Sequence, residues 1–184
     1  MLPSVVSGKM AIEFPIREKE SQMSYPDPHY LGDKGEISAK FRPADQEPEL
    51  MIGSGTAMRY LATGASTNGQ FGLYRVDMRP HTSGPGPHFH RTMSESFFIL
   101  SGTVRLFNGE RWIDATAGDF LYVPEGGVHG FHNESGEPAS MLLLFAPGGP
   151  REAYFEALAE IAAGRQFSDE EWTEFCHRHD NYFL

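Results

Sequence analysis

Four side chains in the middle of the chain combine residue types and spacing that suit a metal centre. His88, His90 and Glu95 lie in one short segment, and His129 lies in a second, glycine-rich segment. Three imidazoles and one carboxylate form a mixed nitrogen and oxygen set that suits a divalent transition metal. Such a set leaves coordination positions open, as a catalytic metal needs. The expected cofactor is one divalent transition metal ion, and Fe, Mn, Ni, Co, Cu and Zn all accept these ligands.

Short β-strands must bring these four side chains together. His88 and His90 are two residues apart, so on one strand they point to the same face. Glu95 lies at an odd offset from His90 and can rejoin the histidines only if residues 91–94 form a turn or bulge. A Pro-Glu-Gly-Gly turn precedes His129 and delivers it to the start of another strand. The sequence therefore predicts a site assembled from several strands.

The remaining pattern indicates an all-β domain with additions at both ends. Short apolar stretches alternate with turn signals through the middle of the chain, which is typical of a sandwich or barrel. Asn108-Gly109 between two such stretches predicts a hairpin. We expect an extended N-terminal arm at 1–50, a jelly-roll β-barrel at 51–148, and a helical segment packed on the barrel at 149–184.

Two helices are predicted in the C-terminal segment. The apolar period changes after Pro150, which suits the first position of a helix. Ser168 and Glu171 have the spacing of a capping box at the start of a second helix. The single cysteine, Cys176, falls on an apolar face of that helix beside aromatic residues. Such a buried thiol has a raised pKa, so we expect packing rather than nucleophilic chemistry from it.

The two histidine segments resemble the paired signature of the cupin superfamily. The first fits H-x-H-x4-E-x6-G from His88 to Gly102, and the second fits G-x5-P-x-G-x2-H-x3-N from Gly118 to Asn133. The first segment departs from the family at Thr82, where cupins usually have a glycine, and this changes only the loop. The resemblance implies the cupin form of the jelly roll and a metal bound by the four side chains named above.

Among cupins, one copy of this ligand set is similar to small single-domain oxygenases of the quercetin dioxygenase type. That resemblance implies a metal-dependent dioxygenase acting on a flavonol-like or other enolisable aromatic molecule. Glu95 would then serve both as ligand and as the catalytic base that takes the substrate's hydroxyl proton. Two alternatives stay open. One is a metal cupin that uses the ion as a Lewis acid (isomerase, cyclase or decarboxylase), and the other is a non-catalytic barrel that binds a small molecule.

A substrate pocket is expected beside the metal, with walls that favour a planar, apolar substrate. Strand parity places two apolar side chains on the face of Glu95 and one on the face of His129, and two tyrosines are further candidates. These residues are Phe97, Ile99, Phe131, Tyr60 and Tyr74.

Composition narrows the choice of compartment and partners. The 184 residues carry a formal net charge of −10, which argues against nucleic acid or an anionic membrane as a partner. One cysteine excludes an internal disulfide framework and fits a reducing compartment. The sequence has no apolar stretch of membrane-spanning length and no basic, apolar leader at its start, so we expect a cytoplasmic protein. The predicted arm and the apolar outward faces of the strands suggest a homodimer.

Overall fold

The computed structural model describes residues 25–184. Residues 41–184 form one compact unit, and residues 25–40, which contain no helix or strand, belong to a separate one. The first 24 residues of the predicted arm lie outside the described residues. Neither helix within residues 25–184 has the length and apolar character that a membrane crossing requires.

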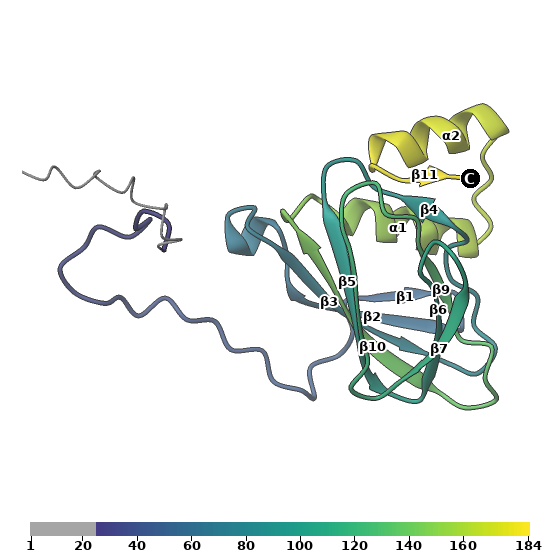
Figure 1. Cartoon of the computed structure of the whole chain (residues 1–184), viewed down its shortest axis with the longest axis horizontal. Helices are drawn as coiled ribbons and strands as arrows, with labels where there is room; N and C mark the ends of the chain where they lie inside the picture. Colours follow the sequence, from purple (N-terminus) through teal and green to yellow (C-terminus); the bar gives the residue numbers. More distant parts are fainter. Residues whose placement is uncertain (1–24) are drawn as a thin grey trace, which may run out of the picture. The chain divides into compact units, whose positions relative to one another are not determined.

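The larger sheet has six antiparallel strands in the order β1-β2-β3-β10-β5-β8 (Figure 1). The order is not sequential, because β10 returns from late in the chain to lie between β3 and β5. The strands are β1 (Leu50–Ile52), β2 (Thr56–Ala62), β3 (Gly72–Met78), β5 (Ser94–Ser101), β8 (Phe120–Val123) and β10 (Ala139–Ala146).

A second sheet of three strands has the order β7-β6-β9, and a third pairs β4 with β11. A single hydrophobic core receives side chains from both larger sheets, for example Phe97 and Met141 from the first and Val104 from the second. The predicted all-β jelly roll is thus confirmed, as two sheets around one core rather than one closed sheet. The bounds are β4 (His88–Phe89), β6 (Thr103–Phe107), β7 (Trp112–Thr116), β9 (Gly130–His132) and β11 (Tyr182–Phe183).

The β6–β7 hairpin forms where the sequence predicts it. Gly109 adopts a φ of 93°, which a glycine tolerates at no steric cost. The Asn108 side-chain oxygen accepts hydrogen bonds from the backbone N–H groups of Glu110 at 3.0 Å and Arg111 at 2.9 Å. Val104 and Leu106 alternate with more exposed residues along β6, so one face of the hairpin joins the core.

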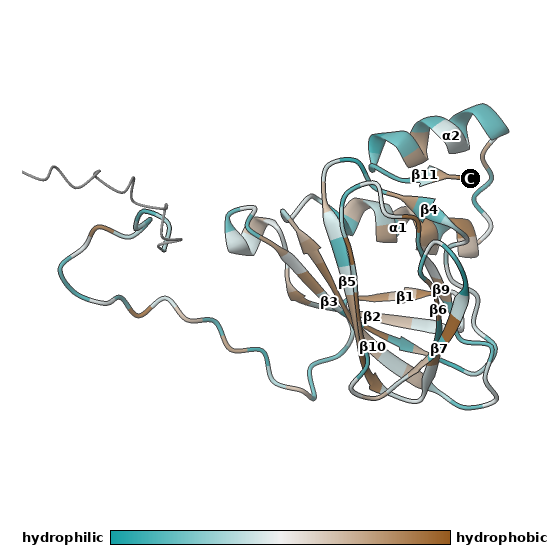
Figure 2. Cartoon of the chain, viewed as in Figure 1, coloured by the Kyte–Doolittle hydropathy of each residue, from teal (hydrophilic) through white to brown (hydrophobic). Residues whose placement is uncertain are grey.

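Two helices follow the last long strand, as predicted. Helix α1 (Glu152–Ala162) packs against β1 and buries Tyr154 and Phe155 in the core. Helix α2 (Asp169–Arg178) begins with the predicted capping box of Ser168 and Glu171. Figure 2 shows α2 as mostly hydrophilic, and Figure 1 shows it with β4 and β11 at one end of the sheets. A short 3-10 turn, η1 (Ala65–Thr67), lies between β2 and β3.

The cysteine of α2 is part of the packing. Cys176 is 3% exposed, and burial raises the pKa of its thiol to about 11. The thiolate, which is the reactive form, is therefore scarce at neutral pH.

Asn133 holds together the loops that flank β9. Its amide nitrogen donates to the carbonyls of Arg79 at 3.0 Å and Glu137 at 2.9 Å. Its oxygen accepts from the backbone N–H of Ser135 at 3.0 Å and from the hydroxyl of the same residue at 2.6 Å. The side chain is 1% exposed, so water cannot replace these partners.

We predict that Asn133→Ala lowers the free energy of unfolding by about 2–4 kcal/mol, because it leaves buried carbonyls without donors. Urea unfolding followed by circular dichroism measures this change. Asn108→Ala, which removes two solvent-exposed turn hydrogen bonds, is the matched control and should cost less than about 1.5 kcal/mol. Equal losses in the two variants would contradict this account of Asn133.

Candidate metal centre

Three strands converge to place the four predicted ligands in one cluster. His88 lies on β4, His90 directly follows that strand, Glu95 lies on β5 and His129 directly precedes β9. Their ligand atoms all lie within 4.8 Å of one another, and all four side chains are buried. The backbones of His88 and His129 exchange hydrogen bonds of 2.9 and 2.8 Å, which fixes two of the imidazoles relative to each other.

The predicted break between His90 and Glu95 is present, and a distant residue stabilises it. Strand β4 ends at Phe89 and β5 begins at Ser94. The carboxylate of Asp180 accepts hydrogen bonds from the backbone N–H groups of Arg91 at 3.0 Å and Thr92 at 2.9 Å, and from the Thr92 hydroxyl at 2.7 Å. Asp180 therefore shapes the turn that returns Glu95 to the histidines.

All three imidazoles are oriented in the same way, because each Nδ1 is hydrogen-bonded to a backbone carbonyl. A carbonyl oxygen can only accept, so each Nδ1 carries a hydrogen and donates it. In the neutral ring this leaves the Nε2 lone pair free as the ligand atom. The acceptors are Gly86 for His88 at 2.9 Å, Gly127 for His129 at 2.9 Å and Asp180 for His90 at 2.6 Å.

The Nε2 atoms point at a carboxylate. Oε2 of Glu95 lies 3.0 Å from Nε2 of His90 and 2.8 Å from Nε2 of His129. A neutral imidazole of this tautomer and an ionised carboxylate both present lone pairs, so this approach is repulsive unless a cation lies between them. A proton on the ring or a bound metal ion would supply that cation. The chemistry of the donor set thus fits a divalent metal.

The pKa values of the cluster show that at least one imidazole stays neutral beside the ionised carboxylate. Burial, with a smaller contribution from a positive charge on His129, lowers the pKa of His88 to about 4, so His88 is neutral at physiological pH. Burial by itself would raise the pKa of Glu95, but the charge and hydrogen bond of His129, with the hydrogen bond of His90, hold it well below its usual range. Burial opposes protonation of His129, yet the charge of Glu95 raises its pKa. An ionised carboxylate beside at least one neutral imidazole is what a metal ion requires.

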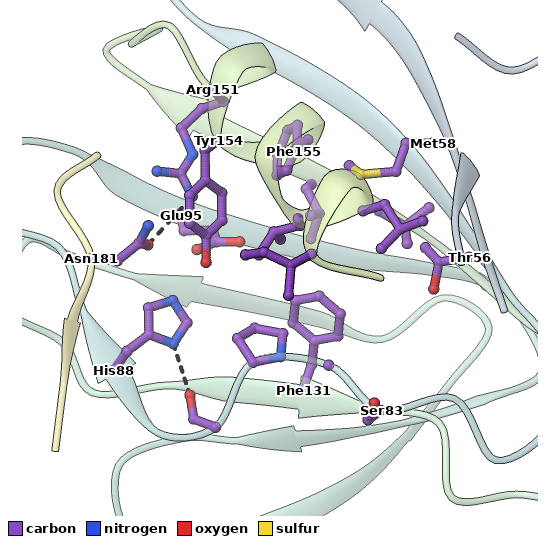
Figure 3. Close-up of a pocket in the computed structure, with 18 of the residues that line it drawn as sticks. Thr56, Met58, Ser83, His88, Glu95, Phe131, Arg151, Tyr154, Phe155 and Asn181 are labelled. Carbon is purple, nitrogen blue, oxygen red and sulfur yellow. Dashed lines mark hydrogen bonds between the residues drawn. The ribbon is translucent and has the colours of Figure 1, made fainter. Parts of the chain in front are cut away.

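A cavity of about 440 Å³ reaches the cluster at His88 and Glu95. Figure 3 shows these two residues toward one end with Arg151 and Asn181, whereas Met58 lies toward the other. Apolar side chains form most of the wall, including Ile52, Met58, Val76, Phe131, Leu143, Phe145, Phe155, Leu158 and Ile161. The cavity thus combines an apolar body with one polar end, which is typical of a small-molecule site.

The predicted pocket residues occupy different places. Phe131 lines the cavity. Phe97 and Ile99 are fully buried in the core, where the Phe97 ring lies 5.7 Å from that of His129. Tyr60 and Tyr74 pack edge to face at 5.5 Å, and the Tyr74 hydroxyl donates to Glu152 at 2.6 Å. Of these five side chains, Phe131 is the one among the lining residues, and the rings of Phe97, Tyr60 and Tyr74 contact rings of lining residues.

Several lining residues come from the C-terminal segment and were not expected at the site. Arg151, Tyr154 and Asn181 line the cavity, and Phe183 stacks on His88 at 5.2 Å. Pairing of β11 with β4 brings this segment to the metal centre. In the sequence, the stretch Cys176-His-Arg-His-Asp180 contains polar residues that could have signalled a role for this segment. The contacts of the Asp180 carbonyl and carboxylate, however, depend on the fold and cannot be read from that stretch.

We predict that Asp180→Asn weakens metal binding by about tenfold or more, because it removes a carboxylate that fixes the turn between two ligands. The substitution suits this position, since Asp180 has a φ of 57° and Asn tolerates that conformation. Competition with a chromogenic chelator measures the metal affinity. Asp114→Asn, at an exposed position on β7, is the control, and equal affinities in the two variants would contradict this role.

Sequence comparisons place the chain among known proteins. A family model described as a cupin domain matches residues 74–145, the part that contains all four ligands. An uncharacterised protein of Streptomyces coelicolor is 30% identical over 107 residues, which cover 58% of this chain and 94% of that protein. Quercetin 2,3-dioxygenase of Bacillus subtilis is 29% identical over 109 residues, which cover 59% of this chain but 32% of the dioxygenase.

A comparison with solved structures also finds a cupin fold. The crystal structure of an RmlC-like cupin from Shewanella frigidimarina superposes with a TM-score of 0.52 at 21% identity, covering 63% of this chain and 96% of that one. At such identity the likeness shows the fold alone. The strand order, the clustered His and Glu side chains and the matching sequences lead to one conclusion: the chain belongs to the cupin superfamily.

Proposed function

We propose that this cupin is a metal-dependent dioxygenase of the quercetin dioxygenase type, acting on a flavonol-like or other enolisable aromatic small molecule. The observation that carries the proposal is the meeting of an apolar cavity of about 440 Å³ with His88 and Glu95 of the candidate metal centre. A flat aromatic molecule in this cavity would present one polar edge to the ligand cluster.

The four clustered side chains, His88, His90, Glu95 and His129, would hold the metal. A divalent transition metal bound there would supply Lewis-acid chemistry and the capacity to activate dioxygen. The carbonyls bonded to each Nδ1 keep the imidazoles in the tautomer that such binding needs.

Glu95 has the position and charge expected of a base. It lines the cavity, and its carboxylate oxygens can accept a hydrogen bond from a substrate hydroxyl. A carboxylate within hydrogen-bond reach of a substrate hydroxyl can accept its proton. Burial to 3% exposure shields that exchange from bulk water.

The wall of the cavity favours an aromatic substrate over a flexible polar one. Phe131, Phe145 and Phe155 supply aromatic surface, and Met58 and Leu143 supply aliphatic surface. Burial of apolar area provides binding free energy without directional contacts. The similarity to the Bacillus subtilis quercetin 2,3-dioxygenase supports this choice of substrate, although the match spans about a third of that enzyme.

We predict oxygen consumption when the metal-loaded protein is mixed with quercetin or a simpler flavonol, measured with an oxygen electrode. Glu95→Gln, compared at equal metal content, should lower kcat by about 100-fold or more, because it removes the proton acceptor. Glu110→Gln, on the exposed β6–β7 turn, should leave kcat unchanged.

Two outcomes would contradict the dioxygenase. Turnover that proceeds equally well without oxygen would indicate Lewis-acid chemistry, as in an isomerase, cyclase or decarboxylase. Ligand binding without turnover, and unaffected by Glu95→Gln, would indicate a binding barrel.

A further inference from the structure

The polar end of the cavity contains a buried guanidinium that the metal centre does not use. Arg151 is 4% exposed, lines the cavity beside Glu95 and immediately precedes α1. Its guanidinium carbon lies 4.5 Å from the ring centre of Tyr154 and 4.8 Å from that of Phe145. These rings hold the group in place and exclude water from it.

Arg151 has only part of its hydrogen-bonding capacity satisfied. Nη1 donates to the carbonyl of His179 at 2.7 Å, and Nη2 donates to the side-chain oxygen of Asn181 at 3.4 Å. Nε is buried and has no hydrogen-bond partner among residues 25–184. Within the same residues, none of the ion pairs includes Arg151. A buried cation without a carboxylate partner is costly to keep.

Asn181 provides a second donor of the same kind. It is fully buried at 0% exposed and lines the same cavity. Its oxygen is occupied by Arg151, whereas its amide nitrogen has no partner in the described part of the chain. Figure 3 shows Asn181 and Arg151 next to each other, on the side of the cavity that also contains His88. Two buried N–H groups without acceptors therefore belong to residues that line one end of an otherwise apolar cavity.

The charges at this end favour an anion. Glu95 is the one carboxylate among the lining residues of the cavity, and it belongs to the candidate ligand set. A divalent ion bound there would more than offset its charge, and Arg151 adds a further positive charge. Low-dielectric walls strengthen the attraction of a negative group to such a site.

We propose that Arg151 and Asn181 bind an acidic oxygen group of the substrate, so that within the enolisable aromatic class an aromatic acid is preferred over a neutral molecule such as a flavonol. The inference rests on the proposed function and specifies its substrate. A carboxylate has the acceptor sites to take both free N–H groups. The aromatic ring would lie along the apolar wall, with the carboxylate and an adjacent hydroxyl directed to the polar end.

The test compares two probes with the same ring and nearly the same size, the anionic 3-hydroxy-2-naphthoate and the neutral 3-hydroxy-2-naphthamide, in which an NH2 donor replaces one carboxylate oxygen. Their dissociation constants are measured by fluorescence titration of the zinc-loaded protein. Zinc has no redox chemistry, so the probes bind without being oxidised. We expect the acid to bind about tenfold or more tightly than the amide, as charge-assisted hydrogen bonds imply. Equal affinities, or tighter binding of the amide, would overturn the proposal without any variant.

Variants separate the Arg151–Asn181 pair from the metal, which also attracts a carboxylate. Asn181→Asp keeps the size of the side chain and the oxygen that Arg151 contacts, but replaces the free donor with negative charge. It should abolish the preference for the acid, and Arg151→Met should reduce it about tenfold. Arg105→Met, at an arginine of β6 outside the cavity, is the matched control. An undiminished acid preference in folded Asn181→Asp protein would overturn the proposal, even if Arg151→Met failed to fold.

Oxygen uptake, measured separately with iron-loaded protein, distinguishes the two claims. Uptake with quercetin but no acid preference would leave the proposed function standing and remove this inference. An acid preference without oxygen uptake, with either probe or with quercetin, would support the anion site and contradict the dioxygenase.

Discussion

The approach of two imidazole nitrogens to one buried carboxylate is the interaction on which the rest of this structure depends. The Nε2 atoms of His90 and His129 lie 3.0 and 2.8 Å from Oε2 of Glu95. The Nδ1 atom of each ring donates its hydrogen to a backbone carbonyl. Lone pairs brought this close need a cation between them. The turns and strand pairings around the cluster form the framework that keeps these atoms together.

The C-terminal segment completes that framework. Asp180 fixes the turn before Glu95 and accepts the hydrogen of His90, while Asn181 and Arg151 close the polar end of the cavity. The segment reaches the centre through the short β4–β11 pair. The same segment thus supports two of the metal ligands and supplies part of the cavity wall, so the metal centre and the substrate pocket share one scaffold.

The ligands could be predicted from the sequence because their placement is local. A spacing of two residues sets the common face of His88 and His90, and turn residues beside His129 set the start of its strand. The cavity wall could not be predicted in the same way. Strand parity correctly places Phe97 on the same face of the strand as Glu95. However, the Phe97 ring packs against His129 in the core, so it does not line the cavity. Arg151 reaches the site through contacts with distant residues, which no local period reveals.

Elemental analysis of the purified protein by inductively coupled plasma mass spectrometry tests the central claim most directly. We expect close to one Fe, Mn, Ni, Co or Cu ion per chain, lost in the double variant His88→Ala/His129→Ala and retained in His132→Ala, whose imidazole contacts Glu134 instead of the cluster. Stoichiometric Zn would keep the metal centre but favour Lewis-acid chemistry. No bound metal in the wild-type protein, even after incubation with each of these ions, would contradict the metal centre and the dioxygenase proposal with it.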